Sequence, residues 1–473
     1  MAWGIDFRCY FCNNVFTNTD FCNRVINGDL LPMRIARELH TSMFRQYSDH
    51  IFSEKLERID SILNKYPEVA DWVLEDLASG KDARGAKGMT AEEVLRAALL
   101  MQIEDLTYRQ LEFHLVDSVA MRAFVHISDG VKYSDSTLQA NIKSISPATW
   151  QKIHLMTVMN AKESGLEKGR TVRLDATVVE TDIALPRDSQ LLVDCLRVIT
   201  QIVAWMKGKE LVINLLYKHK KAKSASLAIL NAKDADEREQ LYLPLIVGAG
   251  DVWKQIPKII EMLNNAKESL KSVAKRIDKL AHVRDHLEAI LAQTIARVID
   301  KDKVLSSDKV ISIFEEHSDI IVKSRRETEF GHKLFITTGK SNLVIDCEIA
   351  EGNPADSDRF MDLLDRVKDV YGKYPRETSA DGGFASAENV EDAKEAGVTN
   401  VCFNKRCCLE ISDMCKSRAV FNRLAKFRAG VESNISALKR GYGLTRAVWK
   451  GLDGFKSYVW SAVVAYNLML LAD

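Results

Sequence analysis

The chain has 473 residues, of which 46% are hydrophobic, so it is long enough for two or three domains with apolar cores. Because 66 Lys and Arg balance 66 Asp and Glu, the formal net charge of zero argues against a protein that coats nucleic acid over its whole surface. The lack of any run of about eighteen apolar residues argues against a membrane partner, and nine scattered cysteines favour a reducing, cytoplasmic location.

Residues 1–32 differ in composition from the sequence that follows, which predicts either an atypical extension or a misassigned start. They contain Cys9, Cys12 and Cys22, but no fourth ligand stands close enough to complete an evident zinc site. An ordinary helical sequence opens at Met33. We therefore expect the first domain to begin there.

Residues 33–160 predict a helical amino-terminal domain. Its helix starts are marked by capping residues, namely Thr90 with Glu93, Thr107 with Gln110, and Ser136. Three short helices joined by tight turns are compatible with a helix-turn-helix-like DNA reader and equally with a structural cap. The residues alone leave both possibilities open.

The segment TVRLDATVVETD, residues 171–182, has the alternation of a β-strand. Apolar side chains stand at every second position, which are Val172, Leu174, Ala176 and Val178. Asp175 is the acid in the middle of this strand, which is rich in β-branched residues. It is a candidate catalytic or metal-binding residue, and its alternative is an ordinary solvated charge.

A helical insertion is expected at about 188–328, between the strand at 171–182 and the strand-like sequence after residue 330. It contains a local basic patch, because six lysines stand against one acid from Lys207 to Lys223. Further on, apolar residues step by four and three as in a coiled-coil seam, at Ile259, Leu263, Ala266, Leu270, Val273, Ile277 and Leu280. No proline lies between Pro257 and Pro354, so one helix of about forty residues, about 60 Å long, is possible. The alternative is a helical hairpin that packs on itself.

Strand-like sequence resumes after residue 330. The segments HKLFITTG and LVIDCEIAEG, residues 332–339 and 343–352, predict a hairpin. A short strand then ends at Asp381, two glycines turn the chain, and Ser386 can cap a helix that Gly397 closes. Asp381 is thereby placed at the carboxyl end of a strand, where open α/β sheets bind ligands.

The segment FRAGVESNISALK, residues 427–439, sets Arg428, Glu432 and Lys439 on one helix face. At about 100° per residue, offsets of four and eleven return to within about 40° of the starting direction. A carboxylate between two cations suits phosphodiester chemistry, where the acid holds a metal and the cations bind phosphates. An ordinary exposed helix face is the alternative. From Lys405 to Lys450, eleven Lys or Arg stand against three acids, which adds a second basic patch.

These motifs together resemble the bacterial insertion-sequence transposases with a ribonuclease-H-like DDE catalytic domain. The resemblance is carried by LDATVVETD, EFGHK, ADGGFAS, RAGVESNISALKRGYGL and GFKSYVWSAVVAYNLMLLA. It implies that the catalytic and metal-binding acids are Asp175, Asp381 and Glu432. It implies DNA contacts for Arg428, Lys439, Arg440 and Lys333. Ala425 stands three residues before Arg428, where the fuller family signature has a Tyr.

The resemblance also implies the architecture, which is α/β. A ribonuclease-H-like mixed-sheet catalytic domain spans residues 168–473, is interrupted by the helical insertion at about 188–328, and follows an all-α amino-terminal domain. The expected cofactor is Mg²⁺, as two ions about 3.5–4 Å apart, for which Mn²⁺ can substitute. The apolar segment YVWSAVVAYNLMLLA is expected to be a buried helix rather than a membrane span.

The implied function is transposition. The protein is expected to bind the terminal inverted repeats of its own element as a homodimer in a synaptic complex, to cleave the ends, and to join them to target double-stranded DNA. It is expected in the bacterial cytoplasm, associated with the nucleoid when bound to DNA. The alternatives are a catalytically inactive DNA-binding relative and a related metal-dependent nuclease.

Overall fold

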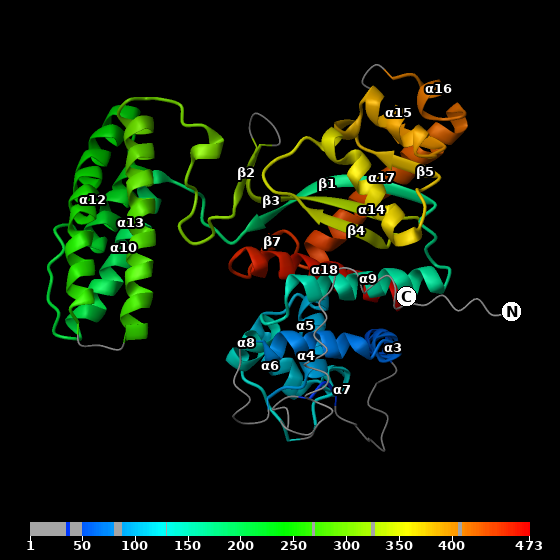
Figure 1. Cartoon of the computed structure of the whole chain (residues 1–473), viewed down its shortest axis with the longest axis horizontal. Helices are drawn as coiled ribbons and strands as arrows, with labels where there is room; N and C mark the ends of the chain where they lie inside the picture. The colour runs from blue at the N-terminus through cyan, green and yellow to red at the C-terminus, as the bar shows by residue number, and fades with distance from the viewer. Residues whose placement is uncertain are drawn as a thin grey trace. The chain divides into compact units, whose positions relative to one another are not determined.

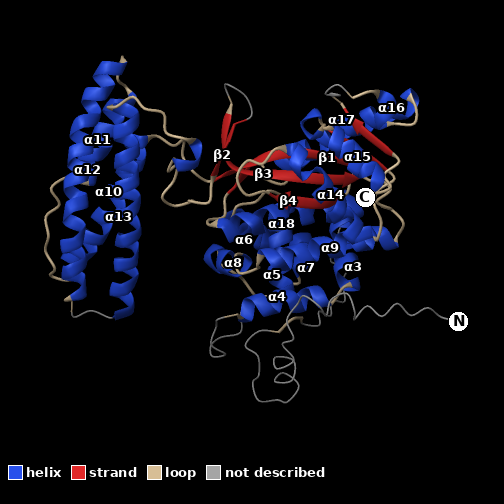
Figure 2. Ribbon diagram, turned by 45° about the horizontal axis from the view of Figure 1, so that its top comes forward, coloured by secondary structure: helices blue, strands red, loops and turns tan. Residues whose placement is uncertain are grey.

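The computed structural model describes most of the chain, in two compact units (Figures 1 and 2). The described residues are 35–37, 50–79, 88–128, 130–266, 270–322, 327–404 and 409–473. The first unit comprises Met1–Lys168, Ser436–Gly443 and Val459–Asp473, and the second comprises Gly169–Ile435 and Leu444–Tyr458. The expected extension at 1–32, with its three cysteines, lies outside the described residues.

The first unit is helical. Its complete helices are α3 (Ile51–Lys65), α4 (Glu68–Ala78), α5 (Ala91–Ile103), α6 (Tyr108–Asp117), α7 (Val119–Val125), α8 (Asp135–Ile142) and α9 (Pro147–Glu163). Both expected capping boxes are present, at the starts of α5 and α6. The expected cap Ser136 is wrong, because α8 begins at Asp135 and its cap is Ser134, whose hydroxyl accepts the Thr137 N–H at 3.3 Å.

Helix α5 forms the centre of the first unit, since all of its residues are buried. Its one buried guanidinium, on Arg96, pairs with Asp60 at 2.6 Å and with Glu92 at 3.0 Å. A helix that is buried on every side supplies core contacts and no surface. A DNA-reading role in this unit would therefore fall to other helices, such as α6 and α8.

The carboxyl-terminal helix α18 (Leu452–Leu471) is buried as expected from its sequence. Its last part belongs to the first unit, where the Gln102 amide donates to the Ser461 hydroxyl at 3.0 Å and the Asn467 amide donates to the Thr157 hydroxyl at 3.2 Å. These bonds satisfy polar groups on an otherwise apolar helix. They tie the end of the chain to the amino-terminal helices.

The second unit contains a seven-stranded mixed sheet. Its strands are β1 (Thr171–Thr181), β2 (Asp319–Val322), β3 (Thr328–Gly339), β4 (Val344–Ile349), β5 (Glu377–Ala380), β6 (Asn400–Phe403) and β7 (Arg446–Ala447). Strand β1 is central, antiparallel to β3 and parallel to β5, and β5 is in turn parallel to β6. β2 and β4 pair with β3, and β7 pairs with the end of β1. The strand expected at 171–182 and the expected hairpin are confirmed.

Helices lie on both faces of this sheet (Figure 2). They are α14 (Asp356–Tyr371), α15 (Ala387–Glu395), α16 (Ile411–Met414) and α17 (Arg418–Gly441). The unit also has two short 3₁₀ turns, η1 (Ser306–Asp308) in the segment before β2 and η2 (Gly382–Phe384) after β5. On one face Phe335 of β3 meets Phe384, which meets Phe360 of α14. On the other face Arg173 of β1 and Ser379 of β5 hydrogen-bond backbone carbonyls of α17. Because alternate residues of β1 face opposite helices, both sides of the strand are buried.

The insertion forms a helical bundle with its own apolar core, in which α10, α12 and α13 run side by side (Figure 1). Its helices are α10 (Asp188–Lys207), α11 (His219–Leu230), α12 (Ala235–Asn264) and α13 (Leu270–Val298). The possible single helix of about forty residues is wrong, because α12 ends at Asn264 and α13 folds back on it. Ile259 and Leu280, expected in one seam, lie in different helices of the same core. The hairpin alternative is confirmed.

Helix α10 is the one described helix with the length and apolar composition of a membrane span. Just over half of its apolar window, 56%, is buried within the protein. Its buried residues, which include Leu192, Leu196 and Ile199, belong to the core of the bundle. The apolar character of α10 is thus used to pack α12 and α13.

Two glycines of α12 test how this helix packs against Tyr217 in the core of the bundle. A Cβ at Gly248 would lie 2.2 Å from the Tyr217 ring, whereas a Cβ at Gly250 would meet nothing within 4 Å. We expect Gly248→Ala to lower the free energy of unfolding of the bundle by about 1–3 kcal/mol through overpacking. Gly250→Ala, its matched control, is expected to raise it by about 0.5–1 kcal/mol through helix propensity. Urea unfolding of the full chain followed by circular dichroism measures both, and equal effects would contradict the packing described.

Candidate active site

The three sequence-selected acids lie on three different elements of the second unit. Asp175 is in the middle of β1, Asp381 directly follows β5, and Glu432 is in α17. Because β1 and β5 are parallel neighbours, with Leu174 opposite Ala380, the next residue of each strand falls at the same level of the sheet. Asp175 and Asp381 therefore approach the same place from adjacent strands.

One arginine contacts all three carboxylates. The Arg428 Nη2 lies 3.1 Å from Asp175 Oδ2 and 3.7 Å from Asp381 Oδ1, and its Nη1 lies 2.7 Å from Glu432 Oε1. The Arg428 side chain is only 10% exposed, whereas those of Asp381 and Glu432 are 45% and 67% exposed. Asp381 and Glu432 thus reach solvent, whereas Arg428 and Asp175 are buried behind them.

Asp175 is the most buried of the three acids, and its environment changes its acidity. Burial raises the pKa of Asp175 to about 6, with a smaller contribution from the charges of Asp381 and Glu432. The Arg428 charge and the hydrogen bond that Asp175 Oδ1 accepts from the Ala176 N–H, at 2.9 Å, act in the opposite direction. Desolvation is the dominant cause. Because it disfavours the ionised carboxylate, a cation bound beside Asp175 would stabilise the charged form.

The turn that carries Asp381 is held by contacts with α14. Gly383 lies so close to the start of α14 that a Cβ there would be 2.5 Å from Asp356 Oδ2. The Asn389 amide donates to the carbonyls of Phe384 and Ser357, at 2.9 Å each. The Ser386 cap and the closing Gly397, with φ of +97°, are present as expected. These contacts fix the backbone on which the Asp381 carboxylate depends.

Lys333, an expected DNA contact, takes part in the same support. Its Nζ pairs with Asp356 Oδ1 at 2.6 Å and donates to the Pro354 carbonyl at 2.8 Å. Since Asp356 packs against Gly383, Lys333 is linked to the Asp381 turn through a single residue. The structure therefore gives Lys333 a positioning contact.

Arg173 is a residue of the site that the sequence did not single out. Its buried guanidinium donates to the Phe427 carbonyl at 2.9 Å, to Thr338 Oγ1 at 2.8 Å and to Asn434 Oδ1 at 2.5 Å. Gly430 makes room for it, because a Cβ there would lie 2.1 Å from Arg173 Nη1. A charged residue two positions before the candidate Asp, in an apolar strand, was the available signal.

The other expected cations lie in the last turns of α17. Lys439 and Arg440 are both within the helix, and Arg440 is exposed. The helix expected to carry Arg428, Glu432 and Lys439 is thus confirmed, and the 2.7 Å contact shows that Arg428 and Glu432 share a face.

The histidine of EFGHK is buried beside the sheet. His332 Nε2 lies 2.8 Å from His317 Nδ1, the two rings stack at 5.1 Å, and Phe455 contacts the His332 ring edge-on at 4.7 Å. Burial lowers the pKa of His332. This arrangement gives His332 a role in supporting the strand.

The donor set at the acids fits a hard divalent metal. Asp175, Asp381 and Glu432 all bring carboxylate oxygens to the same guanidinium, and oxygen ligands are those that Mg²⁺ binds. One buried positive charge faces three carboxylates, so the cluster has capacity for more positive charge.

Comparison with protein-family models gives two matches. Residues 317–468 match a model described as a transposase DDE domain, and residues 50–144 match a model described as a transposase domain. The first match contains Asp381 and Glu432 but begins after the insertion, so Asp175 falls outside it. No curated protein and no solved structure matches the chain.

The raised pKa of Asp175 predicts how the free energy of unfolding changes with pH. The pKa of Asp175 is about 6 in the folded protein and about 4 in the unfolded chain. Protonation of Asp175 therefore contributes to the free energy of unfolding below pH 4, and this contribution is lost as pH rises through about 6. Asp175→Asn removes this loss. We expect the variant's advantage over wild type in unfolding free energy to be about 2–3 kcal/mol larger at pH 7 than at pH 4.

Urea unfolding of the full chain in metal-free buffer at both pH values measures this difference. An advantage of the same size at both pH values would show that the Asp175 carboxylate is not desolvated in the folded protein.

Proposed function

This chain belongs to the insertion-sequence DDE transposase family, and we propose that it binds the terminal inverted repeats of its element, cleaves them and joins them to target DNA. The observation that carries the proposal is the convergence of Asp175, Asp381 and Glu432 on Arg428. A strand acid, a strand-end acid and a helix acid meet at one half-exposed place. That place is open to a phosphodiester on its solvent side.

The sheet supports a ribonuclease-H-like catalytic domain. The order β4-β3-β1-β5-β6, with antiparallel pairing on one side of β1 and parallel pairing on the other, puts the first acid at the centre of the sheet. Helices α14 and α17 cover opposite faces. We propose that this domain spans residues 168–473, with the bundle as an insertion after the first strand, and that its segments Ser436–Gly443 and Val459–Asp473 pack in the first unit.

Asp175, Asp381 and Glu432 would hold the metal, and we propose two Mg²⁺ ions, which Mn²⁺ can replace. Bound metal ions would supply Lewis-acid activation of the attacking oxygen and stabilisation of the leaving 3′-oxygen. Asp175 contributes a carboxylate whose orientation is fixed by the Ala176 N–H, and Arg428 balances the charge of the acids.

We assign Arg428, Lys439 and Arg440 to DNA. Arg428 is the guanidinium nearest the acids, so it is the group best placed to bond a phosphate oxygen there. Lys439 and Arg440 extend the same helix, and Lys333 positions the Asp381 turn. The amino-terminal helices would serve end binding or dimerisation, and the active form would be a homodimer on double-stranded DNA in the cytoplasm.

The insertion offers a second surface for DNA. A groove of about 610 Å³ between α10 and α13 is lined by Lys271, Lys275 and Lys279, which follow one another along one face of α13. The Arg276 guanidinium stacks over the Trp205 ring at 3.6 Å in the same groove. The six lysines from 207 to 223 are also exposed. A row of lysines with a stacked arginine suits a sugar–phosphate backbone and carries no base specificity.

The catalytic assignment is tested by Mg²⁺-dependent cleavage of DNA that carries the element's own ends. We expect Asp175→Asn, Asp381→Asn and Glu432→Gln each to lower cleavage by at least about 100-fold, because each removes a group that stabilises charge in the transition state. End binding, measured by gel shift, is expected to persist in all three.

Asp182→Asn and Glu388→Gln are the controls, since both remove an exposed acid close in sequence to a triad residue. Wild type that binds the ends and cuts nothing would favour the inactive DNA-binding relative. Cleavage without strand joining would favour the nuclease. A triad variant as active as wild type would exclude that acid from the site.

The groove is tested by charge reversal. We expect Lys275→Glu with Lys279→Glu to weaken binding to non-specific DNA and to reduce the slope of log affinity against log salt by about 2, one for each lost phosphate contact. Lys254→Glu with Lys258→Glu makes the same charge change on α12, outside the groove. If both double variants weaken DNA binding equally, affinity depends on the net charge of the bundle and not on the groove.

A further inference from the structure

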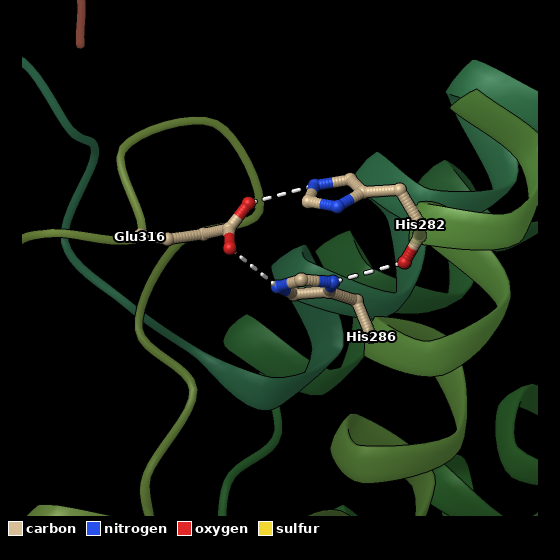
Figure 3. Close-up of side chains that lie close together, drawn as sticks. All are labelled: His282, His286 and Glu316. Carbon is tan, nitrogen blue, oxygen red and sulfur yellow. Dashed lines mark hydrogen bonds and ion pairs between the residues drawn. The ribbon is translucent and has the colours of Figure 1, made fainter. Parts of the chain in front are cut away.

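Two histidines of α13 and one glutamate of the loop before β2 form a cluster away from the acidic triad (Figure 3). His282 and His286 are one helical turn apart, so their rings lie on the same face, with centroids 4.4 Å apart and planes tilted by 42°. Both rings direct a nitrogen at the Glu316 carboxylate. His282 Nε2 lies 2.7 Å from Glu316 Oε1, and His286 Nε2 lies 3.6 Å from Glu316 Oε2.

The other nitrogen of His286 fixes what its Nε2 can do. His286 Nδ1 lies 2.9 Å from the His282 carbonyl oxygen, which only accepts hydrogen bonds, so Nδ1 carries the proton. In the neutral imidazole, Nε2 then presents a lone pair to a carboxylate oxygen. In this tautomer two acceptors face each other at 3.6 Å, beyond hydrogen-bond length, an arrangement that a cation shared by both would stabilise. An imidazole whose Nδ1–H is held by a backbone carbonyl is the usual form of a metal-binding histidine.

We propose that His282, His286 and Glu316 bind a divalent transition metal of the Zn²⁺ class. Their ligand atoms already lie within 4.8 Å of one another, and a small rotation of the side chains brings all three to bonding distance from one ion. The side chains of His282 and Glu316 are 44% and 48% exposed, so the ion can enter from solvent and a water can fill its fourth position. Two imidazoles select such a metal over Mg²⁺, which prefers oxygen ligands.

The contacts of Glu315 and His317, the neighbours of Glu316 in the chain, indicate what a bound ion would do. Glu315 Oε2 accepts the Gly451 N–H at 2.7 Å and lies 3.0 Å from His317 Nε2, while His317 Nδ1 lies 2.8 Å from His332 Nε2 of β3. The residues on each side of Glu316 therefore hold the loop to the sheet and to the start of α18. The metal would hold the same loop to α13, and so would clamp the insertion to the catalytic sheet.

The test uses the full chain with Asp175→Asn, Asp381→Asn and with Cys9, Cys12 and Cys22 replaced by Ser, so that neither the triad nor that cysteine cluster competes for metal. Co²⁺ serves as the probe, since its visible absorption reports nitrogen and oxygen ligands, and Zn²⁺ is then titrated against it. We expect one equivalent to bind and millimolar Mg²⁺ to leave it in place.

Glu316→Gln keeps an oxygen that can accept from His282 but weakens a ligand, and His286→Asn removes another. We expect each to weaken Zn²⁺ binding by at least about 100-fold, no less than the loss of an outer-shell partner. His219→Asn, which changes a histidine of the same bundle outside the cluster, is expected to bind as the parent does.

A second readout separates metal loss from misfolding. Zn²⁺ is expected to raise the midpoint of thermal unfolding in the parent and in His219→Asn, and to leave it unchanged in Glu316→Gln, whose metal-free midpoint matches that of the parent. Unchanged Zn²⁺ affinity and stoichiometry in both cluster variants would overturn the proposal and leave an ordinary ion pair. This outcome is independent of DNA cleavage.

Discussion

The hydrogen bonds of the buried Arg173 guanidinium fix helix α17 on strand β1, and the site depends on this contact. Arg173 reaches the Phe427 carbonyl and Asn434 in α17 and Thr338 in β3, so one side chain ties the helix to two strands. Its location two residues before Asp175 puts it on the same face of β1. Glu432 lies between its two α17 partners in sequence, so the bonds that hold the helix also hold the third acid.

Charge balance is the second constraint on the site. Three carboxylates meet one guanidinium, so when all are ionised the cluster carries an excess of negative charge. Asp175 is the most buried of the three acids, and its burial, with a smaller effect of the two neighbouring carboxylates, raises its pKa to about 6. Arg428 offsets part of the negative charge through its ion pairs with all three acids. The excess that it leaves is what supports the proposal of divalent ions there.

The sequence predicted those features that depend on neighbours in the chain. Alternation placed Asp175 on a strand, turn residues placed Asp381 at a strand end, and helical spacing put Arg428 beside Glu432. Contacts between remote segments were not predictable in this way. Arg173 has partners in β3 and α17, and Glu316 is separated from His286 by the end of α13 and a loop. The end of α12 at Asn264 was missed because the apolar spacing continues through it, and only packing on α13 decides that the chain turns.

The insertion is tolerated because its two ends leave the sheet at nearly the same point. Gly331 of β3 pairs with Glu180 of β1 on one side and with Asp319 of β2 on the other, so entry and exit are about two strand spacings apart, about 10 Å. The Thr181 and Ser318 hydroxyls then meet at 2.6 Å. Gly331 permits this approach, because a Cβ there would lie 2.0 Å from the Val179 carbonyl oxygen. A bundle with its own core can fold between two such closely spaced points without disturbing the pairing of β1 with β3. Asp175 therefore lies close to Asp381 and Glu432, although the insertion separates it from them in sequence.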